Sequence, residues 1–117
     1  MFFDAIRSVI GERDGLGIVR PENYDGSCDY RVTFSWLLNN DPERLNKRSK
    51  NLVIVITQEA VADYHDAPQN VQERAIEMLR DLIAQNLETY DPNHAAPYMT
   101  EEPSEQWLFT SADIVVY

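Results

Sequence analysis

Residues 68–89 constrain the fold more than any other segment of this 117-residue chain. Apolar side chains recur there at intervals of three and four residues, a spacing that places them on one face of a helix. They are Val71, Ala75, Met78, Leu79, Leu82, Ile83 and Leu87. The opposite face carries Glu73, Glu77, Arg80, Asp81 and Glu88. The pattern therefore predicts one long amphipathic helix whose apolar stripe packs against a second layer of the protein.

Three segments predict the strands of that second layer. Residues 30–36 alternate aromatic or β-branched side chains with polar ones, which is typical of a strand with one buried face. Residues 52–56 are apolar throughout and predict a central strand. A short strand is predicted over 17–20, and the Asp25-Gly26 pair predicts the turn that precedes residues 30–36. These segments suit a hairpin followed by a central strand.

Shorter helical segments flank the strands. The apolar residues of 2–11 fall on one helical face. Thr57 is expected to cap a second helix that continues to Tyr64, because a threonine oxygen accepts the free amides of a first helical turn. Asp41 and Pro42 predict a short helical turn in the polar segment before the central strand.

The end of the chain is expected to finish the sheet. Residues 90–105 contain three prolines and predict a loop, and two strands are expected at 107–110 and 114–117. Together the elements predict an α+β fold of one domain over residues 1–117. Its mainly antiparallel sheet of about four to five strands packs against one long helix, with a short helix at the N-terminus.

The charge of the chain is strongly uneven. Residues 1–55 hold eight acids and eight bases, whereas residues 56–117 hold twelve acids against Arg74 and Arg80. The net charge of −10 therefore belongs to the second part. Such an acidic surface attracts basic proteins and can occupy a groove built for nucleic acid, although it also serves solubility. The residues predicted to bind a partner are Glu73, Glu77, Asp81, Glu88, Asp91, Glu101, Glu102 and Glu105.

We therefore expect a non-enzymatic binding or inhibitor protein that engages a basic, nucleic-acid-handling protein, as a phage inhibitor of a host defence complex would. Direct nucleic-acid binding is disfavoured, because the one basic cluster adjoins acids and adds only four positive charges to a chain of −10. That cluster consists of Arg44, Lys47, Arg48 and Lys50.

An alternative is a small enzymatic or metal-dependent site at Asp63, His65, Asp66 and His94. Histidine and carboxylate are both metal ligands, but zinc sites usually need three or four ligands that converge. Cys28 adjoins Asp29, whose charge opposes formation of a thiolate, and no motif for a serine nucleophile or a phosphate loop is present. No catalytic residue, metal ligand or cofactor is therefore predicted.

The single cysteine excludes an intramolecular disulfide. Charged and polar residues interrupt the first ten positions, so these do not read as a signal peptide, and no apolar run is long enough to span a membrane. A cytoplasmic protein is expected. A third alternative is a structural module in which Phe2, Phe3 and Ile6 dock a second copy to form a homodimer.

The run from Leu52 to His65, Leu-Val-Ile-Val-Ile-Thr-Gln-Glu-Ala-Val-Ala-Asp-Tyr-His, resembles a segment of small uncharacterised bacterial proteins. In that group a hairpin leads into a strand, a helix that starts at Ile-Thr-x-Glu-Ala, a long helix and a terminal strand. Thr110-Ser-Ala-Asp113 is similar to the Thr/Ser-x-x-Asp of the group, whereas the polar residues 39–50 depart from its pattern. The resemblance covers about two-thirds of the chain and implies a fold but no activity.

Overall fold

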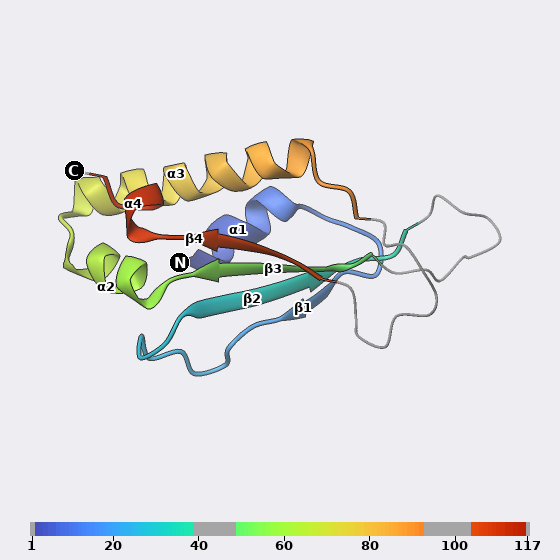
Figure 1. Ribbon diagram of the computed structural model, residues 1–117, viewed down its shortest axis with the longest axis horizontal. Helices are drawn as coiled ribbons and strands as arrows, with labels where there is room; N and C mark the ends of the chain where they lie inside the picture. Colours follow the sequence, from blue (N-terminus) through green and yellow to red (C-terminus); the bar gives the residue numbers. More distant parts are fainter. Residues whose placement is uncertain (1, 39–48, 93–103, 117) are drawn as a thin grey trace.

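In the computed structural model, the helices gather on one face of a twisted four-stranded sheet (Figure 1). The structure describes residues 2–38, 49–92 and 104–116. In chain order the elements are α1 (Phe2–Ile10), β1 (Gly17–Val19), β2 (Tyr30–Ser35), β3 (Asn51–Ile56), α2 (Gln58–Asp66), α3 (Gln69–Glu88), β4 (Ser104–Phe109) and α4 (Ser111–Ile114).

The sheet is mostly antiparallel, with the strands in the order β1-β2-β3-β4. The pairs β1–β2 and β2–β3 are antiparallel, and Val32 lies opposite Ile54 in the second pair. Strand β4 pairs with β3 in the parallel sense, with Ile54 opposite Trp107. A parallel return needs a crossover connection, which α2 and α3 supply. The predicted α+β class, with its mainly antiparallel sheet and one long helix, is confirmed, and the described part of the chain has four strands.

The alternation of side chains along the strands separates the two faces of the sheet. On the face that α1 and α3 cover, Val32, Phe34, Leu52 and Ile54 are fully buried. Strand β4 contributes Trp107 and Phe109 to the same core. On the other face Val19 and Leu108 are exposed. The hydrophobic core therefore lies between the sheet and one layer of helices.

Helix α3 confirms the long helix that the apolar stripe predicts. Its buried residues Val71, Ala75, Leu79 and Ile83 follow one another at intervals of four, and the helix runs along the sheet beside α1 (Figure 1). Burying such a stripe removes several large apolar side chains from water, at roughly 1.5–3 kcal/mol for each. The helix begins directly after Pro68, which cannot donate an amide hydrogen to a preceding turn.

Helix α1 occupies its own core position rather than presenting an apolar face to a second copy. Phe2 and Ile6 are 5% and 0% exposed, and Phe3 packs partly against the same core. Phe2 and Ile6 therefore cover the sheet of their own chain, so the face predicted to dock a second copy is not exposed at these two residues.

The predicted cap of α2 is present. The Thr57 hydroxyl oxygen accepts the backbone N–H of Ala60 at 3.2 Å. Asp29 adds a second, long-range cap, because its carboxylate accepts the backbone N–H of Gln58 at 2.8 Å. The segment before β2 is therefore tied to the start of α2.

The end of the chain differs from the prediction. Strand β4 begins at Ser104 rather than at residue 107, so Glu105 lies in the sheet and not in a loop. The second strand predicted at 114–117 is wrong, since residues 111–114 form the short helix α4. The Asp113 carboxylate accepts the backbone N–H of Thr110 at 2.8 Å and its hydroxyl at 3.0 Å, which caps this helix. Ile114 is fully buried as a result.

The helical turn predicted at Asp41 and Pro42 lies outside the described residues, as does Tyr117. Of the helices that the structure describes, none combines the length and the apolar character that a membrane span requires.

Candidate partner-binding surface

The outer face of α3 brings four of the predicted partner-binding residues together. Glu73, Glu77, Asp81 and Glu88 are all exposed. At 3.6 residues per turn they fall within an arc of roughly 80° on the side of the helix opposite its buried stripe. We call these four residues the acidic row. From Glu73 to Glu88 the row rises through 15 residue steps, which corresponds to about 22 Å along the helix axis.

The acidic row works against the stability of its own helix. Glu73–Glu77 and Glu77–Asp81 are like-charged neighbours four residues apart, each destabilising a helix by about 0.2–0.5 kcal/mol. The first turn of α3 has no acid to complement the positive helix end, and its last turn has no base. Glu88 instead places a negative charge at the negative end of the helix. The arrangement of these acids is therefore not one that helix formation would favour.

Two shallow hollows adjoin the row on either side of Glu73 and Glu77. One has a volume of about 360 Å³ and contains Tyr64, Ile76 and Arg80 among its lining residues. The other has a volume of about 330 Å³ and contains Val71, Arg74 and Val116. Each hollow thus combines apolar side chains with the carboxylates of Glu73 and Glu77. A long basic side chain of a partner fits such a place, because its aliphatic stem packs on apolar surface while its charge meets the acid.

The remaining predicted residues do not simply extend the row. Asp91 is exposed three positions beyond the end of α3 and already has an interaction partner. Glu101 and Glu102 lie outside the described residues. Glu105 lies in β4, where its carboxylate accepts from Lys50 Nζ at 2.9 Å and from Trp107 Nε1 at 2.7 Å.

The environment of Glu105 explains why it is engaged within the fold. Burial alone would raise its pKa, but the hydrogen bonds from Lys50 and Trp107 and the charge of Lys50 outweigh burial and lower the pKa. The Lys50 ammonium also lies 5.2 Å from the ring of Tyr90, which stands edge-on to Trp107. This carboxylate therefore belongs to a network that joins β4, the start of β3 and the end of α3.

Of the alternative site, Asp63, His65 and Asp66 do not converge on one point, and the fourth residue lies outside the described part of the chain. Among the described residues, no three histidine, cysteine or acidic side chains converge closely enough to hold a metal ion, and His94 lies outside that set. The Asp63 carboxylate accepts a hydrogen bond from the Ser111 hydroxyl. His65 is exposed, and its ring stands edge-on to Tyr64 at 5.6 Å. Asp63 thus fastens α4 to α2, while His65 packs within α2.

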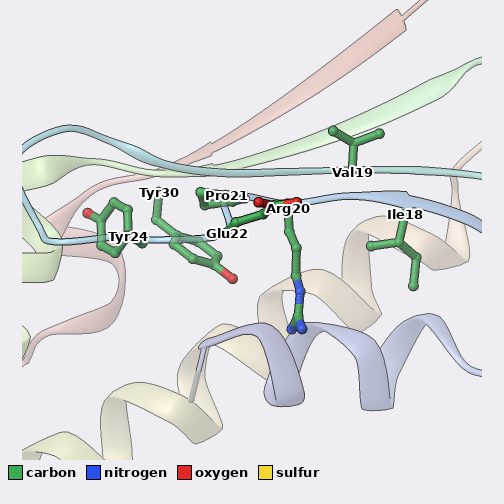
Figure 2. A pocket seen from close by; sticks show the side chains of 7 residues that line it. All are labelled: Ile18, Val19, Arg20, Pro21, Glu22, Tyr24 and Tyr30. Atoms are coloured by element: carbon green, nitrogen blue, oxygen red, sulfur yellow. The ribbon is translucent and has the colours of Figure 1, made fainter.

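Sequence reasoning missed a larger hollow, of about 770 Å³, at the end of β1. Figure 2 shows Arg20 extending from β1 toward α1, with Tyr30 and Tyr24 beside it. The Arg20 guanidinium lies 4.1 Å from the ring of Phe3, and the rings of Tyr24 and Tyr30 meet edge-on at 5.1 Å. No motif reveals this hollow, because its walls come from both sides of the β1–β2 connection.

The hollow beside Arg20 carries both signs of charge. Glu22 lines it together with Arg20. Burial raises the pKa of Tyr30, while Arg20 lowers it and Asp4 raises it further, so one base and one acid lie near the phenol. Cys28 is exposed nearby, and its carbonyl oxygen accepts a hydrogen bond from the Tyr24 hydroxyl at 2.5 Å. This mixture favours no single class of ligand.

A scan of protein-family models and searches of curated proteins and of solved structures find no match to this chain.

Proposed function

We propose that this protein is a non-enzymatic binding protein that engages a basic, nucleic-acid-handling protein through the acidic row of α3. The observation that supports the proposal is the convergence of Glu73, Glu77, Asp81 and Glu88 on one exposed helix face. A field of one sign steers a partner of the opposite sign and raises the rate of association. The proposed setting is the cytoplasm, where the exposed Cys28 stays reduced.

The spacing of the row sets what the partner must offer. Successive acids four residues apart lie about 6 Å apart along the helix axis. One strand of B-DNA carries a charge every 3.4 Å or so of its axis. The row thus presents roughly half the linear charge of one strand, over a length of about 22 Å. We propose that the row occupies part of the groove in which the partner protein binds nucleic acid, and that it does not mimic a whole duplex.

The two hollows beside Glu73 and Glu77 narrow the proposal further. A partner that inserts arginine or lysine side chains gains carboxylate contacts and apolar contact with Ile76 or Val71. Arginine suits these places better than lysine, because its planar guanidinium forms two parallel hydrogen bonds to a carboxylate. Arg74 and Arg80 lie on either side of the row. Their positive charges repel a basic partner that is displaced sideways from the row.

The test is affinity capture from a bacterial lysate with two variants of equal charge. The first carries Glu73→Gln, Glu77→Gln and Asp81→Asn, and the second carries Glu22→Gln, Glu59→Gln and Asp66→Asn. Both change the net charge by three, but only the first alters the acidic row. We expect the first variant to lose at least nine-tenths of a captured basic protein and the second to retain most of it.

Two further conditions decide the class of partner. Raising the salt from 0.05 to 0.5 M should release the captured protein, since screening at high salt shortens the range of the acidic field. Added duplex DNA should release it as well, because both ligands would compete for one basic groove. Captured proteins that are neutral or acidic, or equal losses for the two variants, would show that the acidic row is a solubilising surface.

A further inference from the structure

Strand β4 forms one edge of the sheet and directs half of its peptide groups outward. The backbone N–H of Thr57 donates to the carbonyl of Phe109 at 3.1 Å, so the peptide groups of Phe109 face β3. Successive residues of a strand alternate in this respect. Ser104, Gln106 and Leu108 therefore point their N–H and C=O groups away from β3, where the sheet order ends in the part of the chain that the structure describes.

The two edges of the sheet differ in their protection. Strand β1 is only three residues long and is followed by Arg20 and Pro21, which are features that discourage a further strand. Strand β4 is six residues long and contains no proline, lysine or glycine. Its single acid is already paired with Lys50. The β4 edge thus has the length and the neutrality that strand addition requires.

Apolar surface accompanies the β4 edge on both faces of the sheet. Leu108 is 51% exposed on the open face. On the helix side, Met78 and Leu82 are half-buried and lie on the same flank of α3 as Val71. Val71 lines a hollow together with Val116, which is 40% exposed. Val116 lies two residues beyond the end of α4. Strand β4 itself, which we call the strip, therefore carries no unpaired charge, whereas the hollow beside Val116 is also lined by Glu73, Arg74 and Glu77.

We propose that two copies of this chain associate through an antiparallel β4–β4 pair, with Gln106 opposite Gln106 of the second copy on the two-fold axis. This register pairs all three outward residues at once: Ser104 with Leu108, Gln106 with Gln106 and Leu108 with Ser104. Each such pair exchanges two backbone hydrogen bonds, so the interface gains six. In a register centred on Trp107, the outward peptide groups of Ser104 would have no partner residue within β4 of the second copy.

The charge distribution favours a second copy over a basic partner at this strip. A basic protein gains most at the acidic row, whereas the strip offers it no unpaired carboxylate. Two chains of −10 each approach one another only where acids are absent or neutralised. A six-residue edge is about 20 Å long, so the interface is small and the dimer reversible. The dimer should also strengthen with salt, opposite to the proposed partner binding, which makes the two proposals separable.

The register is tested by disulfide cross-linking in a Cys28→Ser background. Residues directly opposite in a hydrogen-bonded antiparallel pair have Cα atoms about 5.5 Å apart, within the range that a disulfide bridges. Gln106→Cys should therefore yield a species of twice the chain mass under mild oxidation. Val19→Cys, on the exposed β1 edge, is the matched control and should yield at least tenfold less. Equal yields at the two positions would overturn the register.

Sedimentation of the unmodified chain tests association itself. We expect dimer at concentrations of hundreds of micromolar, with a larger fraction in 0.5 M than in 0.05 M salt. Gln106→Pro removes an outward N–H without touching the β3 ladder, and Leu108→Lys adds a charge to the open face. Each should raise the dissociation constant at least tenfold while the circular dichroism spectrum stays unchanged. A chain that is monomeric at 1 mM, or variants that dimerise like the parent, would contradict the proposal.

Discussion

Lys50 Nζ lies 2.9 Å from Glu105 Oε1, and this ion pair joins two residues that are 55 positions apart in the chain. Lys50 directly precedes β3, and Glu105 is the second residue of β4. The pair sits beside Tyr90, whose ring meets both Trp36 and Trp107 edge-on. A cation, an anion and three aromatic rings thus fix the place where β4 enters the sheet.

Replacing Lys50 with methionine should destabilise the protein by about 1–2 kcal/mol at pH 7. The change leaves a half-buried carboxylate without its cation, which costs more than the loss of a surface pair and less than that of a fully buried one. The folded state lowers the pKa of Glu105 below its ordinary value of 4.5. Its contribution is therefore present above the unfolded pKa and is lost as the pH falls through the folded one.

The measurement is urea unfolding of Lys50→Met and the parent at pH 7 and pH 3. The difference between the two proteins should shrink as the pH falls below 4.5 and through the lowered pKa of Glu105, because the carboxylate is then protonated. Glu105→Gln serves as the control, because its amide oxygen can still accept the hydrogen bond from Trp107 Nε1. Adding Lys50→Met to Glu105→Gln should lower the free energy of unfolding little further, since the ion pair is already gone. A difference that is equal at both pH values would assign the effect to packing of the lysine stem.

Tyr90→Phe should stabilise the protein by about 1 kcal/mol at neutral pH. The Tyr90 hydroxyl is buried and has no hydrogen-bond partner within the described part of the chain, whereas its ring packs against two tryptophans. Removing an unsatisfied buried hydroxyl recovers its desolvation penalty and keeps the ring contacts. Tyr24→Phe is the control, since the Tyr24 hydroxyl donates to the Cys28 carbonyl, and this variant should gain nothing.

The same variant should change the response to alkaline pH. Burial, helped by Glu105 and Asp91, raises the pKa of Tyr90 to about 12 from an ordinary value of 10.0. The Tyr90 hydroxyl therefore loses its proton at a lower pH in the unfolded chain than in the folded protein. The free energy of unfolding is unaffected by this group below pH 10 and decreases between about pH 10 and pH 12. Tyr90→Phe removes this part of the loss. Parallel stability curves of the two proteins from pH 9 to pH 11.5 would contradict the assignment.

Elements with their own periodicity were predictable from the sequence, and those formed by distant contacts were not. The spacing from Val71 to Leu87 predicts α3, and the uninterrupted apolar run 52–56 predicts β3. The start of β4 escaped prediction because Ser104, Glu105 and Gln106 are not strand formers. Pairing with β3 and the ion pair to Lys50 place them in the sheet. At the other end, Val115 and Val116 favour a strand, but the local Thr110–Asp113 cap produces a helix first.

The same distinction applies to the candidate surface. The acidic row was predictable, because four acids on one helix repeat their spacing in the sequence. The sequence groups Glu105 with the other acids of the second part, because its partner Lys50 is remote in sequence and their ion pair cannot be read from a local pattern. The Arg20 hollow likewise depends on how the β1–β2 connection folds back to bring Tyr24 beside Tyr30. Local patterns identify faces of elements, whereas pairs across elements require the tertiary structure.

Glu77→Gln should raise the free energy of unfolding by about 0.4–1 kcal/mol at low salt. The change removes two like-charged contacts, with Glu73 and Asp81, each worth about 0.2–0.5 kcal/mol. Arg74 and Arg80 lie three residues to either side, but neither forms an ion pair with Glu77 in the described part of the chain, so they offset little of this gain. Glu59→Gln is the control of opposite sign, because Glu59 lies in the first turn of α2 and complements the helix dipole. In 1 M salt both effects should become small. A loss of stability for Glu77→Gln would show that this carboxylate makes a favourable contact within the fold.

Asp113→Ala should destabilise the protein by about 1 kcal/mol and loosen α4 selectively. The carboxylate accepts both the backbone N–H and the hydroxyl of Thr110, so its loss removes one half of the capping box at the start of α4. Fraying should then expose Ile114, which is fully buried in the parent. Hydrogen exchange of the Val115 amide, which donates to the Ser111 carbonyl at 2.8 Å, should accelerate by at least tenfold. Asp113→Asn keeps an acceptor, so its Val115 exchange rate should fall between those of Asp113→Ala and the parent. Equal exchange rates in all three proteins would show that α4 is held by the burial of Ile114 alone.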